Sequence, residues 1–194
     1  MKEGILHVIG NLGLGGAQSV LYHLWPFLCR SNRYAFEICA LNYLGHFGEL
    51  LRSEGAVVYC LGCKHKYDPK AILGLRKIIL GGSYKIVHVH LFPELIIAPL
   101  AVMGLPHVHL VYTEHLPTNR RRRLGIAAKI LDRLAYRRYA RIIAVNSSTY
   151  RNLIAWLPEL ASRSIHVPNA VRVDFTKRRE SAAKVHLMRK LGLT

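Results

Sequence analysis

The sequence predicts an α/β fold in which helices cover both faces of a doubly wound parallel sheet. Short apolar strands alternate with helical segments along the chain, as in successive βαβ units. Several of these strands are almost continuously apolar, which is expected when both faces of a sheet are covered. A glycine-rich turn at residues 10–16 joins the first strand to the first helix. Such a turn lets backbone N–H groups approach a phosphate at the positive end of the helix dipole.

The elements follow in order from this pattern. Strands are predicted at Ile5–Ile9, Ala35–Leu41, Ala56–Leu61, Ile86–His90, His109–Thr113, Arg141–Val145 and Ser164–Val167. Helices are predicted at Ala17–Cys29, Phe47–Glu54, Pro69–Leu80, Pro93–Met103, Leu124–Tyr139, Ser147–Ala155 and Ser181–Leu191. After Val171 the alternation ends, and the composition indicates a linker into the last helix.

The charge of the chain is strongly positive and uneven. The 194 residues carry a net charge of +17, of which +4 falls on residues 1–99 and +13 on residues 100–194. Such a field attracts anionic partners: nucleic acid, anionic lipid or phosphorylated ligands. No apolar stretch reaches the roughly 20 residues of a membrane span, and no secretory signal is visible. We therefore expect a cytoplasmic protein of one domain, or of one domain with a small appendage.

The cysteine spacing offers a weak indication of a metal or redox site. Cys60 and Cys63 have the spacing of half a zinc site. No second pair of ligands with suitable spacing follows, so we interpret the two thiols as small apolar side chains near a strand end. We expect neither a metal nor another cofactor.

The glycine-rich turn departs from the standard nucleotide-binding patterns. Gly13 and Gly15 supply the first two glycines of G-x-G-x-x-G, but Gln18 occupies the third position. The second strand ends at Leu41 without the carboxylate that would hold a ribose. An NAD(P)-binding protein is therefore a weaker alternative, and a structural turn without a ligand also stays open.

Six segments taken together resemble family 4 glycosyltransferases, which are retaining enzymes of the two-domain GT-B architecture. They are GLGGAQ at 13–18, YLGHFGEL at 43–50, IVHVH at 86–90, VYTEH at 111–115, IIAVNSS at 142–148 and IHVPNAV at 165–171. The last is similar to the interdomain hinge of the family, with Pro168 and Asn169. The resemblance implies a Rossmann-like N-terminal domain at residues 1–167, one half of a GT-B fold. Residues 168–194 would then be the hinge and the start of a nucleotide-sugar-binding domain.

The resemblance also implies roles for residues that follow the predicted strands, where open parallel sheets bind ligands. His115 would contact the transferred sugar as the catalytic residue, donating a hydrogen bond to it. The donor phosphate or sugar would face Gly13, Gly15, Gly16 and Gln18, and acceptor or sugar contacts would come from His90, Glu114, Asn146 and Ser147. Without the resemblance, His115 fits a structural histidine at a strand end equally well, and His90 fits a buried core position.

A basic segment follows the fifth predicted strand. Its cationic residues are Arg120, Arg121, Arg122, Arg123, Lys129, Arg133 and Arg137, beside an apolar stripe of Ile126, Ile130 and Leu134. Two interpretations stay open: a solvated helix that packs its apolar stripe on the sheet, and docking to an anionic membrane surface. We rank nucleic acid below membrane, because the segment lacks aromatic residues spaced for base stacking.

The predicted function is that of the acceptor-side domain of a glycosyltransferase. It would move a hexosyl group from a nucleotide sugar to a glycan or lipid-linked acceptor, in the cytoplasm or at the inner face of the membrane. The E-x7-E pattern of the family's donor-binding domain is missing here. We therefore expect the chain to need a donor-binding domain or subunit and to catalyse little alone. The alternative is a non-catalytic basic module that binds anionic membrane or nucleic acid.

Overall fold

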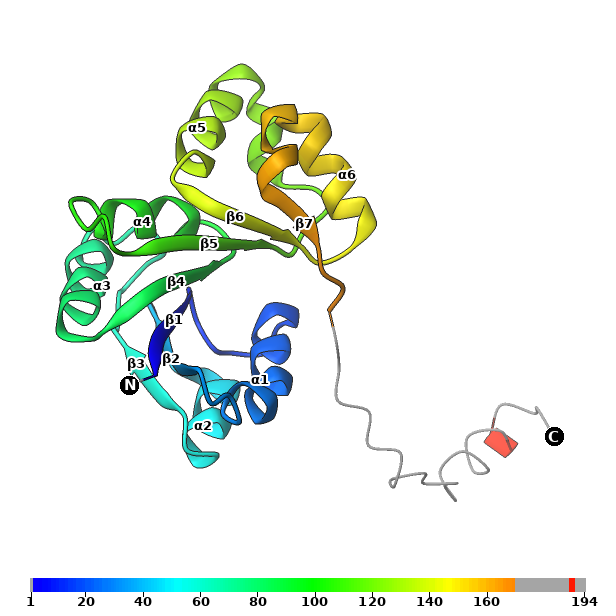
Figure 1. The fold of residues 1–194 in the computed structure, drawn as a ribbon. Helices are drawn as coiled ribbons and strands as arrows, with labels where there is room; N and C mark the ends of the chain where they lie inside the picture. Colours follow the sequence, from blue (N-terminus) through cyan, green and yellow to red (C-terminus); the bar gives the residue numbers. More distant parts are fainter. Residues whose placement is uncertain (1, 170–188, 191–194) are drawn as a thin grey trace.

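The computed structural model describes residues 2–169 and 189–190 of the chain. Within them, seven strands form one sheet in the order β3-β2-β1-β4-β5-β6-β7 (Figure 1). The strands are β1 (Glu3–Ile9), β2 (Tyr34–Ala40), β3 (Val57–Cys60), β4 (Tyr84–His90), β5 (His109–Glu114), β6 (Tyr139–Ala144) and β7 (Ser164–His166). Every neighbouring pair is parallel, which confirms the predicted fold class.

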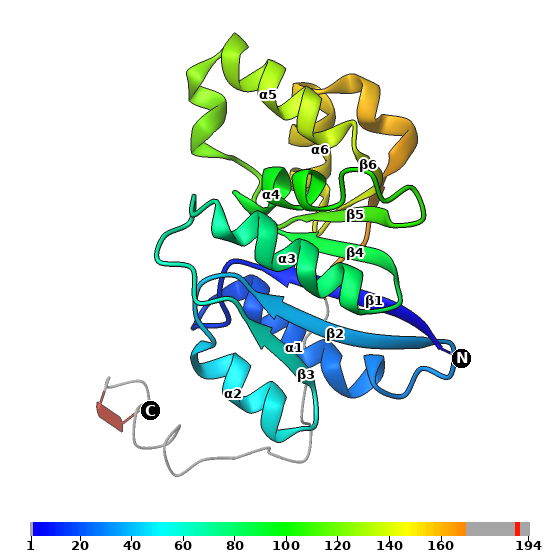
Figure 2. The same ribbon diagram turned by 90° about the vertical axis from the view of Figure 1, so that its left-hand side faces the viewer.

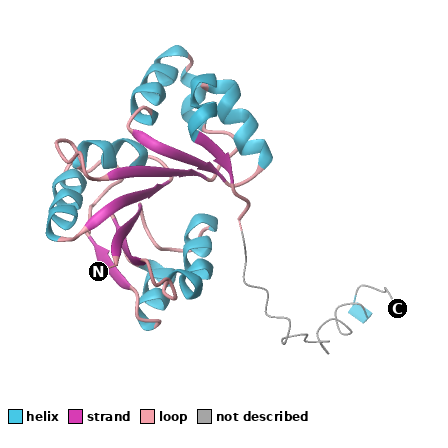
Figure 3. Cartoon of the chain, in the orientation of Figure 1, coloured by secondary structure: helices cyan, strands magenta, loops and turns pink. Residues whose placement is uncertain are grey.

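Helices cover the sheet from both sides (Figures 2 and 3). The α-helices are α1 (Gly16–Leu28), α2 (Gly45–Ser53), α3 (Lys70–Gly81), α4 (Glu94–Ala101), α5 (Ile126–Tyr136) and α6 (Ser147–Trp156). Two 3-10 helices, η1 (Arg120–Leu124) and η2 (Pro158–Arg163), complete the connections. Leu21 of α1 and Leu51 of α2 pack with β2 in one core, whereas Leu75 of α3 and Leu95 of α4 pack with β4 in the other.

Sequence periodicity placed the strands and the six α-helices to within three residues at each boundary, whereas the two 3-10 helices were not predicted. The main difference lies around Gly125, whose φ of 65° is left-handed and interrupts the helix predicted at 124–139. The arginines before this glycine form η1, and Asn119 caps η1 by accepting a hydrogen bond from the Arg121 N–H. The predicted helix at 181–191 and the linker after Val171 lie outside the described residues.

The orientation of α5 contradicts one interpretation of its apolar stripe. Ile126, Ile130 and Leu134 are 79%, 53% and 57% exposed, whereas Asp132 and Tyr136 of the same helix are buried. Asp132 faces inward because it forms ion pairs with two arginines of η1. The interpretation that the stripe packs on the sheet is therefore wrong, since the ion pairs determine the buried face of α5.

No helix in the described part of the chain has both the length and the apolar composition needed to cross a bilayer.

Candidate functional site

The centre of the sheet contains the point at which the strand order reverses. β1 and β4 are neighbours, but the chain leaves β1 toward β2 and leaves β4 toward β5. Ligands of doubly wound sheets bind outside the carboxyl ends of the strands at such a point. Leu91, immediately after β4, has a φ of 69°. A left-handed leucine is strained, and strain of this kind concentrates at functional sites.

A cavity of about 430 Å³ lies at this edge and is called here the glycine-loop cavity. It is lined by Gly16, Ala17, Gln18, Ser19, Val20, Leu91, His115, Leu116 and Asn169. The fold thus brings together residues predicted from three separate segments: the glycine turn, the end of β5 and the segment after β7.

The glycine turn presents bare backbone to this cavity. Gly15 is the N-cap of α1 and Gly16 its first residue, and a Cβ at Gly16 would have nothing within 4 Å. The free N–H groups of a first helical turn favour an anion at this position.

Gly13 has a different place in the turn from Gly15 and Gly16. It is buried, donates its N–H to Asn11 Oδ1 at 3.1 Å, and lies against Gly45. A Cβ at Gly45 would be 2.6 Å from the Gly13 nitrogen, and Gly45 has a left-handed φ of 64°. Gly13 and Gly45 therefore shape the loop from behind. Gln18 also contacts Asn11, with its Nε2 donating to Asn11 Oδ1 at 3.4 Å.

Three histidines form a hydrogen-bonded line that ends at the glycine-loop cavity. His7 Nδ1 lies 3.1 Å from His90 Nε2, and His90 Nδ1 lies 3.1 Å from His115 Nε2. We call His7, His90 and His115 the histidine line. His88, beside them on β4, pairs its Nε2 with Thr113 Oγ1 at 2.7 Å. None of these bonds joins residues close in sequence, so they depend on the register of β1, β4 and β5.

Burial keeps these imidazoles neutral. Desolvation lowers the pKa of His7 from 6.5 to about 4 and that of His115 to about 4. It also holds the pKa values of His88 and His90 well below the usual range, with repulsion from the neighbouring histidines as a smaller cause. A neutral imidazole has one N–H donor and one acceptor nitrogen. Because His90 occupies Nε2 of His115, Nδ1 is the His115 atom left for a ligand.

His7, His88 and His90 form the one group of possible metal ligands among the described residues. Their ligand atoms lie within 4.8 Å of one another. The His88 and His90 rings are stacked, however, with centroids 4.5 Å apart and planes at 29°. Stacked rings direct their nitrogens side by side, and His7 Nδ1 is already bonded to His90. The absence of a metal stays our prediction.

The two cysteines offer no second candidate centre. Cys60 is exposed and Cys63 is buried, and both are free thiols. Burial is the main cause that raises the pKa of Cys63, which opposes formation of a thiolate ligand.

A second cavity, of about 540 Å³, adjoins the first and is called here the arginine cavity. It is lined by Leu91, Phe92, Glu114, Leu116, Thr118, Asn119, Arg120 and Arg123. Leu91 and Leu116 line both cavities. The two spaces therefore meet at the strained residue after β4.

The fold divides the four consecutive arginines into two pairs. Arg121 Nε donates to Asp132 Oδ1 at 2.6 Å, and Arg122 Nη2 donates to Glu114 Oε2 at 3.3 Å. Arg120 and Arg123 are exposed, and within the described part of the chain neither has a carboxylate partner. The inner pair holds η1 in place, and the outer pair is free for ligands.

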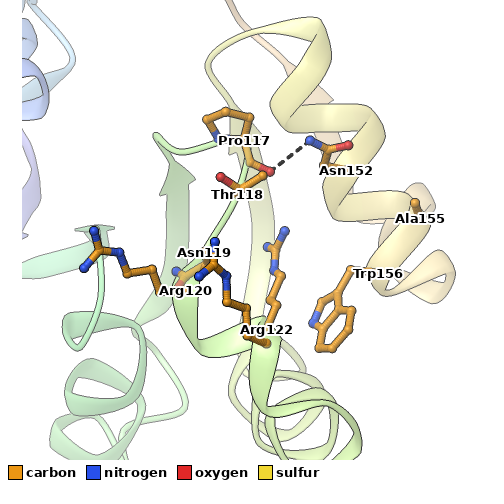
Figure 4. A pocket seen from close by; sticks show the side chains of 9 residues that line it. Pro117, Thr118, Asn119, Arg120, Arg122, Asn152, Ala155 and Trp156 are labelled. Carbon is orange, nitrogen blue, oxygen red and sulfur yellow. Dashed lines mark hydrogen bonds between the residues drawn. The ribbon is translucent and has the colours of Figure 1, made fainter.

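A third cavity, of about 540 Å³, separates η1 from α6 (Figure 4). Asn152 of α6 donates to the Pro117 carbonyl at 3.0 Å across it, and Trp156 forms its far wall. Arg120 extends away from Trp156 in this view. Of the other predicted cations, Lys129 lies over the Trp156 ring at 5.5 Å and Arg133 pairs with Glu159, while Arg137 is exposed.

The remaining residues predicted to contact substrate either form hydrogen bonds within the protein or do not line the glycine-loop cavity. The Glu114 carboxylate accepts hydrogen bonds from the Tyr136 hydroxyl at 2.7 Å and from Arg122, and burial raises its pKa. Asn146 caps α6 by accepting the Thr149 N–H at 2.8 Å. Ser147 and Pro168 are exposed and line neither of the two adjoining cavities.

One titratable group at this edge escaped the sequence reasoning. Glu94, in the first turn of α4, is 2% exposed, and burial raises its pKa to about 7. A Cβ at Gly10 would lie 2.6 Å from Glu94 Oε1, so the glycine provides the space for this carboxyl group. Acidic residues are common in first helical turns. An acidic residue at this position is therefore ordinary by itself, and only its place four residues after His90 could have marked Glu94 as a candidate.

Comparison with known proteins finds a matching family and several similar structures. A model of Glycosyltransferase Family 4 matches residues 14–175. HepE from Anabaena, solved in complex with UDP and glucose, superposes with a TM-score of 0.72 at 17% identity, over 98% of this chain and 50% of HepE. MurG from Acinetobacter baumannii superposes with a TM-score of 0.61 at 13% identity, over 90% of this chain and 47% of MurG. The chain thus spans about half the length of these proteins. A search of curated protein sequences gave no match.

Proposed function

The chain belongs to glycosyltransferase family 4, and from this we propose that it is the acceptor-side domain of a retaining glycosyltransferase. It would move a hexosyl group from a nucleotide sugar to a glycan or lipid-linked acceptor without a metal. The observation that carries the proposal is the glycine-loop cavity, which joins the backbone of Gly16 to the His115 side chain. The likeness to HepE, which was solved with UDP and glucose, supports a nucleotide-sugar donor.

We assign the two ends of the cavity different roles. The backbone at Gly15 and Gly16 faces the donor's diphosphate or sugar, because the first turn of α1 is electropositive and carries no acidic side chain. His115 donates a hydrogen bond from Nδ1–H to the transferred sugar. The histidine line is compatible with this tautomer: if the His7 proton is on Nδ1, each ring donates to the next, and His115 presents Nδ1–H to the cavity.

We also propose that catalysis requires a donor-binding domain or subunit. β7 ends at His166, and we propose that the first domain ends at residue 167 and that Pro168 and Asn169 begin the hinge. Asn169 lines the glycine-loop cavity, so movement at the hinge would act directly on the site. Transfer from UDP-glucose by the 194-residue chain alone would contradict this proposal.

The direct test of the catalytic assignment is the substitution His115→Ala. Transfer from UDP-glucose, measured with the donor-binding domain present, should lose roughly 100-fold in kcat, the usual effect of removing one charge-stabilising donor. His107→Ala is the matched control, since His107 is exposed and precedes β5 at the opposite edge of the sheet. An unchanged rate for His115→Ala would reject the assignment. A non-catalytic module that binds membrane would instead show no transfer at all, and His115→Ala would leave its membrane binding unchanged.

We further propose that α5 attaches the protein to an anionic membrane. Its exposed side chains combine Ile126, Ile130 and Leu134 with Arg133, and the exposed Arg137 follows directly as its C-cap, which is the composition of an interfacial helix. Each cation near an anionic surface contributes about 1 kcal/mol. The exposed isoleucines would enter the boundary between headgroups and acyl chains.

Vesicle flotation would test this attachment. The double substitution Ile126→Ser and Ile130→Ser should weaken binding to phosphatidylglycerol-containing vesicles about tenfold or more, because burying even part of two isoleucines contributes over about 1.4 kcal/mol. Leu73→Ser, a change at a 72% exposed residue of α3, should leave binding unchanged. The proposal would be contradicted if the wild type, the double variant and Leu73→Ser bound equally. It would also be contradicted if the wild type bound equally well to vesicles with and without anionic lipid.

A further inference from the structure

The arginine cavity lies beside the proposed reaction centre. Its Leu91 and Leu116 also line the glycine-loop cavity, where His115 is found. Its volume of about 540 Å³ is sufficient for a group the size of a diphosphate with part of an attached sugar or chain. A molecule held in it would extend past Leu91 toward His115.

The balance of charge in this cavity is positive. The four arginines of η1 face two buried carboxylates, Asp132 and Glu114. Both carboxylates are already occupied by the inner arginines, and Glu114 also accepts the Tyr136 hydroxyl. Arg120 and Arg123, which line the cavity, are therefore not neutralised by any carboxylate in the described part of the chain.

A buried guanidinium, whose charge is paired with Asp132, lies behind the cavity wall and leaves N–H donors there unsatisfied by the residues that the structure describes. Arg121 stacks over the ring of Phe92, with 4.5 Å from its Cζ to the ring centroid, and Phe92 lines the cavity. Both terminal nitrogens of Arg121 are buried and have no hydrogen-bond partner among the described residues. Unpaired buried donors of this kind are rare in folded proteins. Their field is weakly screened, because water is excluded around them.

We propose that the arginine cavity binds a phosphate or diphosphate group of the acceptor, with Arg120 and Arg123 as its ligands. The planar guanidinium matches phosphate oxygens in bidentate geometry. The inference rests on the proposed function, and it narrows the acceptor to molecules that carry this anion near the hydroxyl that is glycosylated. The same chemistry occurs in a lipid-linked phosphate and in a soluble sugar phosphate.

Calorimetric titration of the 194-residue chain with inorganic pyrophosphate would test the site. The double substitution Arg120→Gln and Arg123→Gln should weaken binding about tenfold or more, and wild-type binding should weaken with added salt. Arg141→Gln with Arg151→Gln removes the same charge from exposed residues outside this cavity and should change the affinity less than about twofold. Circular dichroism confirms that each variant is folded.

Equal losses in the two double variants, or no loss in the first, would overturn the proposal. Titrations with geranyl diphosphate and with glucose 1-phosphate then show whether the anion belongs to a lipid-linked or to a soluble acceptor. Tighter binding of the prenyl compound than of pyrophosphate supports the site with a lipid-linked acceptor, and tighter binding of the sugar phosphate supports it with a soluble one. No donor is present in these titrations, so a failure of sugar transfer would not affect them. Loss of the anion site with sugar transfer intact would leave the proposed function standing.

Discussion

The free energy of unfolding should fall steeply as the pH is lowered from about 6.5 to about 4. Burial lowers the pKa of His7 and of His115 from 6.5 to about 4, and His88 and His90 are shifted in the same direction. Above pH 6.5 these imidazoles are neutral in both states and their contribution to stability is complete. Below it the unfolded chain binds protons at these four histidines that the folded chain excludes, so stability is lost until the native values are reached. The buried Glu94, whose pKa is raised to about 7, opposes this loss by about the contribution of one histidine.

The expected size of this loss is large. Each histidine contributes up to about 1.4 kcal/mol per pH unit, so His7 alone would account for about 3 kcal/mol over the interval. Urea denaturation at a series of pH values measures the slope. His115→Gln removes one of the four groups and should make the slope shallower. A free energy of unfolding that stays constant between pH 7 and pH 5 would show that the histidines are not neutral and buried as described.

Replacing Asp132 by asparagine should lower the free energy of unfolding by about 3–5 kcal/mol. Asp132 is 1% exposed, and its carboxylate accepts hydrogen bonds from Arg121 Nε at 2.6 Å and from Trp156 Nε1 at 3.0 Å. Arg122 Nε lies 3.9 Å from the same carboxylate. The substitution keeps the shape but removes the charge, so it leaves two guanidinium groups with one carboxylate, Glu114. Breaking a buried ion pair in this way has costs of this size.

Chemical denaturation of matched variants would isolate this effect. Glu159→Gln breaks the pair with Arg133, whose side chains are 40% and 50% exposed, and should change stability by less than about 1 kcal/mol. Trp156→Phe removes a single hydrogen bond to Asp132 and provides a milder variant if Asp132→Asn does not fold. If Asp132→Asn and Glu159→Gln were equally stable, the buried cluster would have no special role. A large loss for Asp132→Asn alone would show that this carboxylate holds η1, and with it the walls of the arginine cavity.

The candidate site was only partly predictable. Gly16, Gln18, His115 and Asn169 were predicted as functional residues from separate motifs, and the fold places them around one cavity. Their catalytic and binding roles stay predictions. The sequence offered no sign of the link from His7 to His115, because those bonds join strands far apart in the chain. Glu94 was missed for a related reason: its burial depends on the closeness of Gly10, which is distant in sequence.

The local pattern of the sequence determined which segments are strands or helices and that the sheet is parallel. Periodicity and glycine placement act within a few residues, and those are the interactions that a sequence displays directly. Only the tertiary structure decided which face of α5 is buried and which arginines stay free. Both depend on Asp132, whose charge cannot be buried without the guanidinium groups of η1. An apolar stripe that a helix would usually bury is therefore left exposed, because α5 instead buries the face that carries the ion-paired Asp132.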